Sequence, residues 1–266
     1  MAWMLEVATD RDEAARDGED RADVLGCPID RLDMDGTLAR IDGLIESRGF
    51  AQHVAINTAK LVAMRSDREL SEIVRRCEVI SADGQSVVWA SRLLRDPLPT
   101  RVAGIDLMHE LLARAEERDY GVFVLGAKPD VLERACARIL EQHPRLRLVG
   151  RRDGYFPEAD DAAVAAEIKA ARPDILFVAI SSPRKEYFLG RYGREIGVPF
   201  VMGVGGSVDV IAGITRRAPV VFQRLGIEWL YRLAQEPRRL WRRYLVTNAQ
   251  FMSLLARELA GRAARS

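Results

Sequence analysis

Cysteine, histidine and lysine are scarce in this sequence, and their scarcity excludes several kinds of site. The three cysteines, Cys27, Cys77 and Cys136, are widely spaced and form no CxxC or CxxH pair, so neither a structural zinc site nor a disulfide framework is predicted. We interpret them as reduced, buried thiols. The three histidines are expected to be structural, because no Ser-His-Asp pattern or metal-ligand spacing surrounds them.

Long apolar runs are also lacking. No segment approaches the ~20 apolar residues of a membrane-spanning helix, and acidic residues stand near the start where a signal peptide would have its apolar core. Residues 1–22 mix charge with Ala and Gly, and we expect them to form a disordered leader. The sequence therefore predicts a protein that stays cytoplasmic unless it binds a membrane surface.

Charge of one sign does not dominate the chain as a whole. With 40 Lys and Arg against 39 Asp and Glu, a nucleic-acid partner is not favoured. Positive charge is instead local, because eight arginines fall between Arg216 and Arg243 against only Glu228 and Glu236. Trp229, Tyr231 and Trp241 interrupt this run, and the combination indicates contact with phosphate groups or an anionic surface.

Apolar segments alternate with helical patterns through most of the chain. Hydrophobic residues make up 48% of the sequence, which is enough for a sizeable core. Strands are predicted over 53–57, 78–84, 122–125, 146–149, 174–180 and 199–204. Strands that alternate with helices indicate a mainly parallel sheet covered by helices, that is, a Rossmann-like α/β fold. We expect this α/β core to span 23–224 and a basic, amphipathic helical appendage to span 225–266.

Polar residues or glycines follow most of these strands. Ligands of parallel sheets bind at the carboxyl ends of the strands, so the residues there are expected to share one edge. They are Asn57, Asp83, Gly126, Ser181 and Gly205. In the last of these segments, Gly205 and Gly206 leave the backbone free to turn sharply beside an anionic ligand. A tight turn before a packed helix is the alternative interpretation of these glycines.

Asp83 has two interpretations. A carboxylate at a strand end, partly shielded by Val79, Ile80 and a helix over 85–94, suits a general base. Aspartate is equally favoured as the N-cap of that helix. The residues around Asp83 leave both open.

The segment 31–37, RLDMDGT, invites two further interpretations: the DxDGT of phosphatases that form an aspartyl-phosphate, and the metal-binding DxD of sugar transferases. The phosphatase motif requires an apolar strand that leads into the first Asp, and residues 27–32 are not expected to form one. We therefore predict a solvated turn before a helix over 38–47.

Two helices are predicted after Gly213, over 227–235 and 237–260. In the second, apolar residues recur at three- and four-residue steps from Trp241 to Leu259, and arginines crowd its first turns. Such a helix can lie on an anionic membrane or cover a phosphate site. Packing on the core with solvated arginines is the alternative.

Several ordered motifs match a known family. They are the strand end at Asn57, ADG at 82–84, RVAGID at 101–106, VLG at 124–126, GYF at 154–156, PRKE at 183–186, the glycine-rich run 203–213, RAP at 217–219, EWLYRL at 228–233 and EPRR at 236–239. Over residues 24–244 the chain thus resembles the WecG/TagA/CpsF bacterial glycosyltransferases.

The resemblance implies inverting, metal-independent transfer of N-acetylmannosamine or a related hexose from a UDP-sugar. The acceptor would be an undecaprenyl-diphosphate-linked sugar at the cytoplasmic membrane face, in the synthesis of cell-surface polysaccharide or teichoic acid. No cofactor is implied, and a homo-oligomer is left open. Asp83 would be the general base. The residues that would bind the donor or the acceptor are Asn57, Arg101, Gly126, Tyr155, Lys185, Gly205, Gly206, Asp209, Arg232, Arg239 and Arg242.

The chain departs from the family pattern at three positions. Ala55 stands where the family usually has Thr, Ser181 where it commonly has Gly, and Lys185 where it usually has Gln. Lys185 could supply a further cation for phosphate or indicate a different donor sugar. Two other functions remain as alternatives: a nucleotide-binding oxidoreductase, for which the GxGxxG spacing is missing at the first strand, and a non-catalytic membrane- or nucleic-acid-binding module.

Overall fold

The computed structural model describes residues 20–224, 226–235 and 237–264, without the side chains of Arg224, Arg239, Leu240 and Arg243. Residues 1–19 of the predicted leader lie outside the described residues. Arg21 and Ala22, which were assigned to the leader, instead begin the first strand. Folding therefore starts before Val24.

Six parallel strands form the central sheet. They are β3 (Ala51–Ile56), β4 (Val79–Ala82), β5 (Gly121–Gly126), β6 (Arg147–Arg152), β7 (Ile175–Ala179) and β8 (Phe200–Gly203), in the spatial order β4-β3-β8-β7-β5-β6. Every neighbouring pair is parallel. The predicted mainly parallel, Rossmann-like α/β fold is confirmed.

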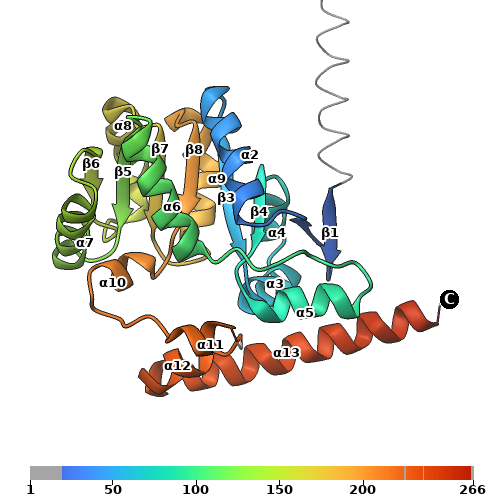
Figure 1. The fold of residues 1–266 in the computed structure, drawn as a ribbon. Coiled ribbons are helices and arrows are strands. Elements are labelled where there is room, and N and C mark those ends of the chain that lie inside the picture. The colour runs from blue at the N-terminus through green and yellow to red at the C-terminus, as the bar shows by residue number, and fades with distance from the viewer. Residues whose placement is uncertain (1–19, 225, 236, 265–266) are drawn as a thin grey trace, which may run out of the picture.

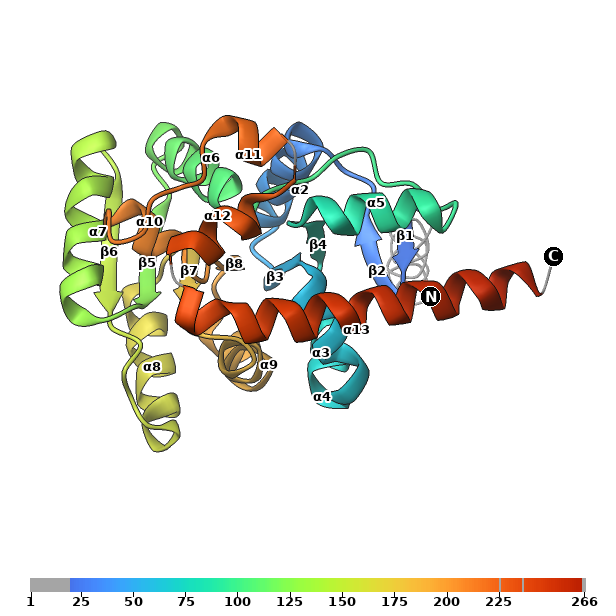
Figure 2. The same cartoon turned by 90° about the horizontal axis from the view of Figure 1, so that it is seen from below.

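Helices cover both faces of this sheet (Figures 1 and 2). They are α2 (Met34–Glu46), α3 (Thr58–Ser66), α4 (Arg68–Arg75), α5 (Gln85–Leu93), α6 (Gly104–Glu117), α7 (Pro129–Gln142), α8 (Asp161–Ala171), α9 (Arg184–Ile196), α10 (Ser207–Ile211), α11 (Val220–Arg224), α12 (Glu228–Gln235) and α13 (Pro237–Ala263). One face packs against α2, α6 and α7, and the other against α3, α4, α8 and α9. Each face thus has its own apolar core.

A small antiparallel hairpin, β1 (Arg21–Val24) and β2 (Cys27–Asp30), lies beside β4. Its turn uses Leu25 and Gly26, both with positive φ. Residues 27–30 thus form a strand, but it ends at Asp30 and does not lead directly into Asp33, as expected. The strand is short and carries Pro28, but the hairpin partner and the carboxylate of Asp30, which accepts a 2.7 Å hydrogen bond from the Ile80 N–H, hold it in place.

The DxDGT segment is the beginning of a helix. Asp33 is the N-cap of α2 and accepts a 2.9 Å hydrogen bond from the Gly36 N–H. The helix starts at Met34, so the predicted start at residue 38 is wrong by one turn. Asp33 and Asp35 are exposed, and no apolar strand leads into them, which favours neither the phosphatase nor the DxD interpretation.

The chain after Gly213 lies along the carboxyl ends of the strands. Figure 1 shows α10, α11, α12 and α13 below the sheet, at the edge from which α3 and α5 also start. Near the far end of α13, Phe251 and Leu255 are buried in the core formed with α3, α4 and α5. The predicted helical appendage therefore covers the edge where parallel sheets bind ligands.

Gly126 is a position where only glycine fits. Its φ is +126°, and a Cβ there would lie 2.5–2.8 Å from backbone atoms of Ala179 on β7. We predict that Gly126→Ala lowers the free energy of unfolding by roughly 3 kcal/mol, since backbone strain and a clash with backbone add together. Denaturant unfolding of the purified variant measures this.

Gly43→Ala is the matched control for that prediction. Gly43 is exposed within α2, and a Cβ there meets nothing within 4 Å. The control should raise the free energy of unfolding by about 0.5–1 kcal/mol, because alanine restricts the unfolded chain and favours the helix. Equal stability of both variants would contradict the close packing of β5 on β7.

Candidate functional site

Asp83 lies one residue beyond the end of β4. The register of β3 and β4 pairs Ile56 with Ala82, which places Asn57 and Asp83 next to each other on neighbouring strands. One carboxylate oxygen of Asp83 accepts a 2.9 Å hydrogen bond from the N–H of Gly104, the first residue of α6. The positive end of α6 therefore points at this carboxylate and holds one of its oxygens in place.

The N-cap interpretation of Asp83 is wrong for the helix that follows it. The N-cap of α5 is Gly84, and no side chain caps that helix. Asp83 instead contacts α6, a helix that starts 21 residues later in the chain. Its side chain is partly buried, and within the described part of the chain its second oxygen has no hydrogen bond. That oxygen is free to meet a substrate.

Asn57 caps α3. Its side-chain oxygen accepts a 3.1 Å hydrogen bond from the Lys60 N–H. A Cβ built on Gly84 would lie 3.8 Å from the Asn57 Cα, so the two strand ends are in close contact. Asn57 therefore has a structural role and also lies beside Asp83.

A buried cluster of three charged side chains lies between α3, α9 and β8. Lys60 and Lys185 both donate to the same oxygen of Glu186, Lys185 at 2.6 Å, and all three residues are at most 9% exposed. The other oxygen of Glu186 is buried without a hydrogen-bond partner among the described residues. The cluster holds two cations against one anion.

Burial and mutual charge shift the protonation equilibria of this cluster. Burial, together with the charge of Lys60, lowers the pKa of Lys185 to about 8. Burial alone would raise the pKa of Glu186, but the charges of Lys60 and Lys185 outweigh it and lower that pKa to about 2. Glu186 is therefore ionised at neutral pH, and Lys185 gives up its proton more readily than an exposed lysine.

The glycines at the end of β8 and in the turn after it have different roles. A Cβ on Gly203 would lie 2.5 Å from Cε of Lys185, so this glycine makes room for the lysine side chain. Gly205 has φ +48°, and a Cβ there would meet nothing within 4 Å. Gly206 is exposed, and Asp209 lies beside it in α10. The open turn at Gly205 and Gly206 thus adjoins the lysine cluster.

Gly126 and Tyr155 lie farther along the same edge. Four strand spacings separate β4 from β5 in the sheet, which is about 19 Å. A Cβ on Gly154 would lie 2.9 Å from the Cα of Gly126, so Gly126 serves backbone packing. Tyr155 is 69% exposed. The sheet therefore places all five predicted strand ends on one edge, but Gly126 and Tyr155 do not meet Asp83.

Arg101 joins the core to the appendage. Its guanidinium donates to Glu228 of α12 at 2.9 Å, and both side chains are largely buried. Nearby in the sequence, Asp106 of α6 pairs with both terminal nitrogens of Arg217 at 2.7 Å. Gly226 lies against Gln85 and Trp89 of α5, with no room for a Cβ. These contacts place the start of the appendage beside α5 and α6, next to Asp83.

The remaining predicted arginines belong to the appendage. Arg232 of α12 and Arg242 of α13 are exposed, and Arg242 lies over the Trp241 ring at 5.8 Å. The side chain of Arg239 lies outside the described residues. A contact between the Trp229 and Tyr244 rings, with centroids 6.0 Å apart, holds α12 against α13.

Sequence reasoning missed Lys60, Glu186 and Glu228 as members of this region. One signal was available, because only four lysines occur in the chain and two of them meet at Glu186.

Of the histidines, His53 is fully buried, its Nε2 lies 2.9 Å from the Ser81 hydroxyl, and burial lowers its pKa to about 3. It is a neutral core residue, as predicted.

The described residues contain neither a candidate metal site nor a candidate membrane span. No group of three or more His, Cys, Asp or Glu side chains is close enough to hold a metal ion, within the ranges that the structure covers. Across the same residues, no helix is both long and apolar enough to span a membrane.

Residues 22–265 match the model of the glycosyl transferase WecG/TagA/CpsF family. The matched range takes in the whole sheet, the Asp83 edge and the appendage. Proteins of this family transfer sugars in the synthesis of cell-surface polysaccharides. The chain belongs to the WecG/TagA/CpsF glycosyltransferase family.

Proposed function

We propose that this protein transfers a hexose, N-acetylmannosamine or a related sugar, from a UDP-sugar to an undecaprenyl-diphosphate-linked sugar, with inversion and without a metal. The observation that carries the proposal is the Asp83 carboxylate, held by α6 through one oxygen while the other is free. Family membership argues against the oxidoreductase alternative and against a non-catalytic module.

In this mechanism Asp83 is the general base. The acceptor hydroxyl gives its proton to the free oxygen of Asp83 and attacks the anomeric carbon from the side opposite to UDP. The bond from that carbon to the UDP oxygen breaks, and one glycosidic bond replaces it with inverted configuration. Asn57, beside Asp83, would orient the sugar that reacts.

The departing UDP carries negative charge that positioned cations can stabilise. Lys185 and Lys60 supply buried positive charge beside the open turn at Gly205 and Gly206. Arg101 lies on the other side, on the loop after α5, where it would exchange Glu228 for a phosphate oxygen. Arg232, Arg239 and Arg242 would add charge from the appendage, and Asp209 would contact the nucleotide.

The appendage also supports a membrane-borne acceptor. Several apolar residues of α11 and α13 are each more than half exposed. They include Val221 of α11 and Trp241, Leu245 and Met252 of α13. Arg238 and Arg242 lie on the same helix and are exposed as well. Exposed apolar residues among arginines are typical of helices that rest on an anionic membrane surface. We infer a peripheral site at the inner face of the membrane.

One assay tests the reaction itself. UDP-sugars are screened against an undecaprenyl-diphosphate-linked sugar with excess chelator present, and the anomeric configuration of the product is read by NMR. Turnover with inversion supports the proposal. A strict requirement for an added divalent cation would contradict metal independence. Retention of configuration at the anomeric carbon would contradict the single-displacement mechanism.

We predict that Asp83→Asn lowers kcat by ~10²–10⁴ and leaves UDP affinity within a few-fold of the wild type. Asparagine keeps the oxygen that accepts from Gly104 but cannot take a proton, so the fold should survive. Steady-state kinetics and calorimetry with UDP measure the two quantities. Asp35→Asn, in the DxDGT segment, is the control and should behave like the wild type. Near-normal turnover by the Asp83 variant would show that Asp83 is not the base.

A second prediction concerns pH. Lys185 is charged below its pKa of about 8 and neutral above it, so UDP affinity should fall as the pH rises through about 8. In Lys185→Gln, which introduces the residue usual in the family, affinity at pH 7 should fall about tenfold and this pH dependence should vanish. Calorimetry between pH 6 and 9.5 measures both, roughly within the range in which proteins stay folded.

Lys169→Gln is the control for that variant. Lys169 is exposed on α8, away from the strand ends, and its loss should leave the pH profile of the wild type unchanged. If Lys185→Gln kept the fall in affinity above pH 8, another group would be responsible for it.

A further inference from the structure

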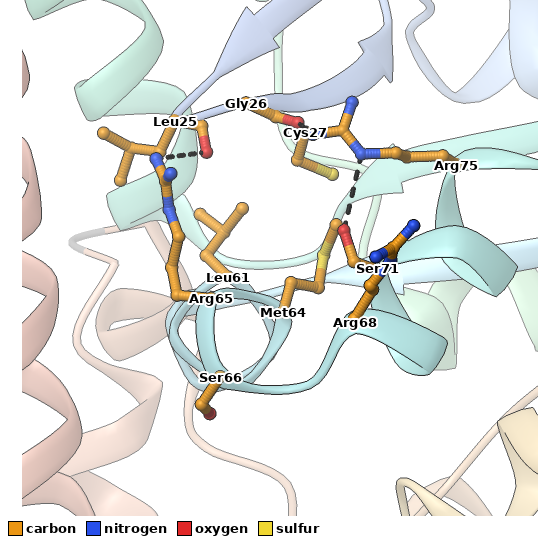
Figure 3. Close-up of a pocket in the computed structure, with 10 residues that line it drawn as sticks. All are labelled: Leu25, Gly26, Cys27, Leu61, Met64, Arg65, Ser66, Arg68, Ser71 and Arg75. Atoms are coloured by element: carbon orange, nitrogen blue, oxygen red, sulfur yellow. Dashed lines mark hydrogen bonds between the residues drawn. The ribbon is translucent and has the colours of Figure 1, made fainter.

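A cavity lies beside the β1–β2 hairpin, at the β4 end of the sheet. It has a volume of about 330 Å³ and lies between the turn of the β1–β2 hairpin and helices α3 and α4 (Figure 3). Leu61 and Met64 of α3 and Cys27 of β2 form its apolar part, and Arg65, Arg68 and Arg75 form its charged part. None of these residues belongs to the proposed sugar-transfer site.

Two of the arginines are fixed in place without losing their charge. Arg65 donates to the carbonyl oxygen of Leu25 at 2.8 Å, and Arg75 donates to that of Gly26. A carbonyl is neutral, and among the described residues no carboxylate lies within ion-pair distance of either guanidinium. Most of their N–H groups remain available, because each guanidinium has five.

The two guanidinium groups converge on one place. A Cβ built on Gly26 would lie 3.4 Å from Nη2 of Arg75 and 3.9 Å from Nη2 of Arg65. Figure 3 shows the two side chains on opposite sides of the cavity, with Ser71 beneath Arg75. The Arg75 Nε donates to the Ser71 hydroxyl at 3.4 Å. A single anion in the cavity can therefore contact both guanidinium groups.

The other charged groups nearby offset this charge only in part. Arg68 pairs with Glu72 at 2.9 Å, but both are exposed and water weakens the pair. Asp23 accepts from the Gly26 N–H at 2.7 Å on the far side of the turn. Burial raises the pKa of Cys27 to about 12, so its thiol is neutral. The cavity thus combines a net positive rim with an uncharged, apolar floor.

We propose that this cavity binds the phosphate group of a phosphate ester, at a site separate from the sugar-transfer site. Paired guanidinium groups match the oxygens of a phosphate, which accept several N–H bonds at once. The apolar floor of Leu61 and Met64 suits the carbon part of an ester better than inorganic phosphate alone. Two sources supply this chemistry: a soluble phosphate ester, and the headgroup of an anionic phospholipid, because α13 packs against α3 beside the cavity.

Calorimetry of the full chain with glycerol phosphate tests the site. Saturating UDP is present throughout, so that binding at the proposed nucleotide turn does not contribute, and the result does not depend on the transferase mechanism. We expect saturable binding by the wild type and at least a tenfold loss of affinity in Arg65→Gln/Arg75→Gln. Arg134→Gln, which removes an exposed arginine from α7, should bind like the wild type.

Ser71→Glu separates binding from the stability of the hairpin. It keeps both arginine contacts to the turn but places a carboxylate beside Arg75, so it should also lose at least tenfold in affinity while melting like the wild type. Sedimentation with phosphatidylglycerol and phosphatidylcholine vesicles then identifies the source. Weaker retention of both variants by phosphatidylglycerol vesicles alone assigns the site to a lipid headgroup, and unchanged retention assigns it to a soluble ester.

Two results would overturn the proposal. One is the absence of saturable glycerol phosphate binding by the wild type up to about 10 mM, where even a weak specific site would fill. The other is unchanged affinity in both the arginine and the Ser71 variants.

Discussion

Burial of Lys60, Lys185 and Glu186 in one cluster is the constraint on which the ligand-binding edge depends. Each buried ion costs several kcal/mol in lost hydration, and only close pairing offsets that cost. Glu186 belongs to α9 and Lys60 to α3, and the Lys185 side chain fits only because Gly203 of β8 has none. The three charges thus fix α3 and α9 against β8, and with them Asn57 and the turn at Gly205.

The appendage is held by contacts of a different kind at its two ends. Near the edge of the sheet, polar contacts dominate: Arg101 pairs with Glu228, and Asp106 with Arg217. At the far end, Phe251 is buried in the core. Ion pairs near water are weaker and exchange more readily than a buried apolar contact. The end next to Asp83 is therefore the one that a phosphate ligand can rearrange, while α13 stays attached.

Much of the fold followed from the sequence because its signals are local. Strands that alternate with helices require a parallel sheet, and the polar residues after each strand then must share an edge, which is how Asp83 and Asn57 could be placed together. The β1–β2 hairpin could not be found in this way, because its strands are short and include Pro28. Its stability comes from contacts with β4 that no local pattern encodes.

The contacts within the site were harder to predict for the same reason. Lys60 and Glu186 are 126 residues apart, and they meet only because β3 and β8 are neighbours in the sheet. The hydrogen bond from Gly104 to Asp83 likewise requires knowing where α6 begins, and no pattern marked that helix clearly. Residue type and strand end could thus select Asp83 as the candidate base, whereas the groups that hold it depend on strand order.

Strand order also separates the two tasks that the proposed reaction requires. Asp83 follows β4, whereas Lys185 lies against Gly203 at the end of β8, and β3 runs between these two strands, so two strand spacings, about 10 Å, separate the two strand ends. An acceptor hydroxyl, a sugar ring and the first phosphate of UDP fit in line across such a distance. On adjacent strands, Lys185 could form an ion pair with Asp83 and occupy the carboxylate oxygen that is left free for the acceptor hydroxyl. The intervening strand therefore keeps that oxygen free while Lys185 stays paired with Glu186.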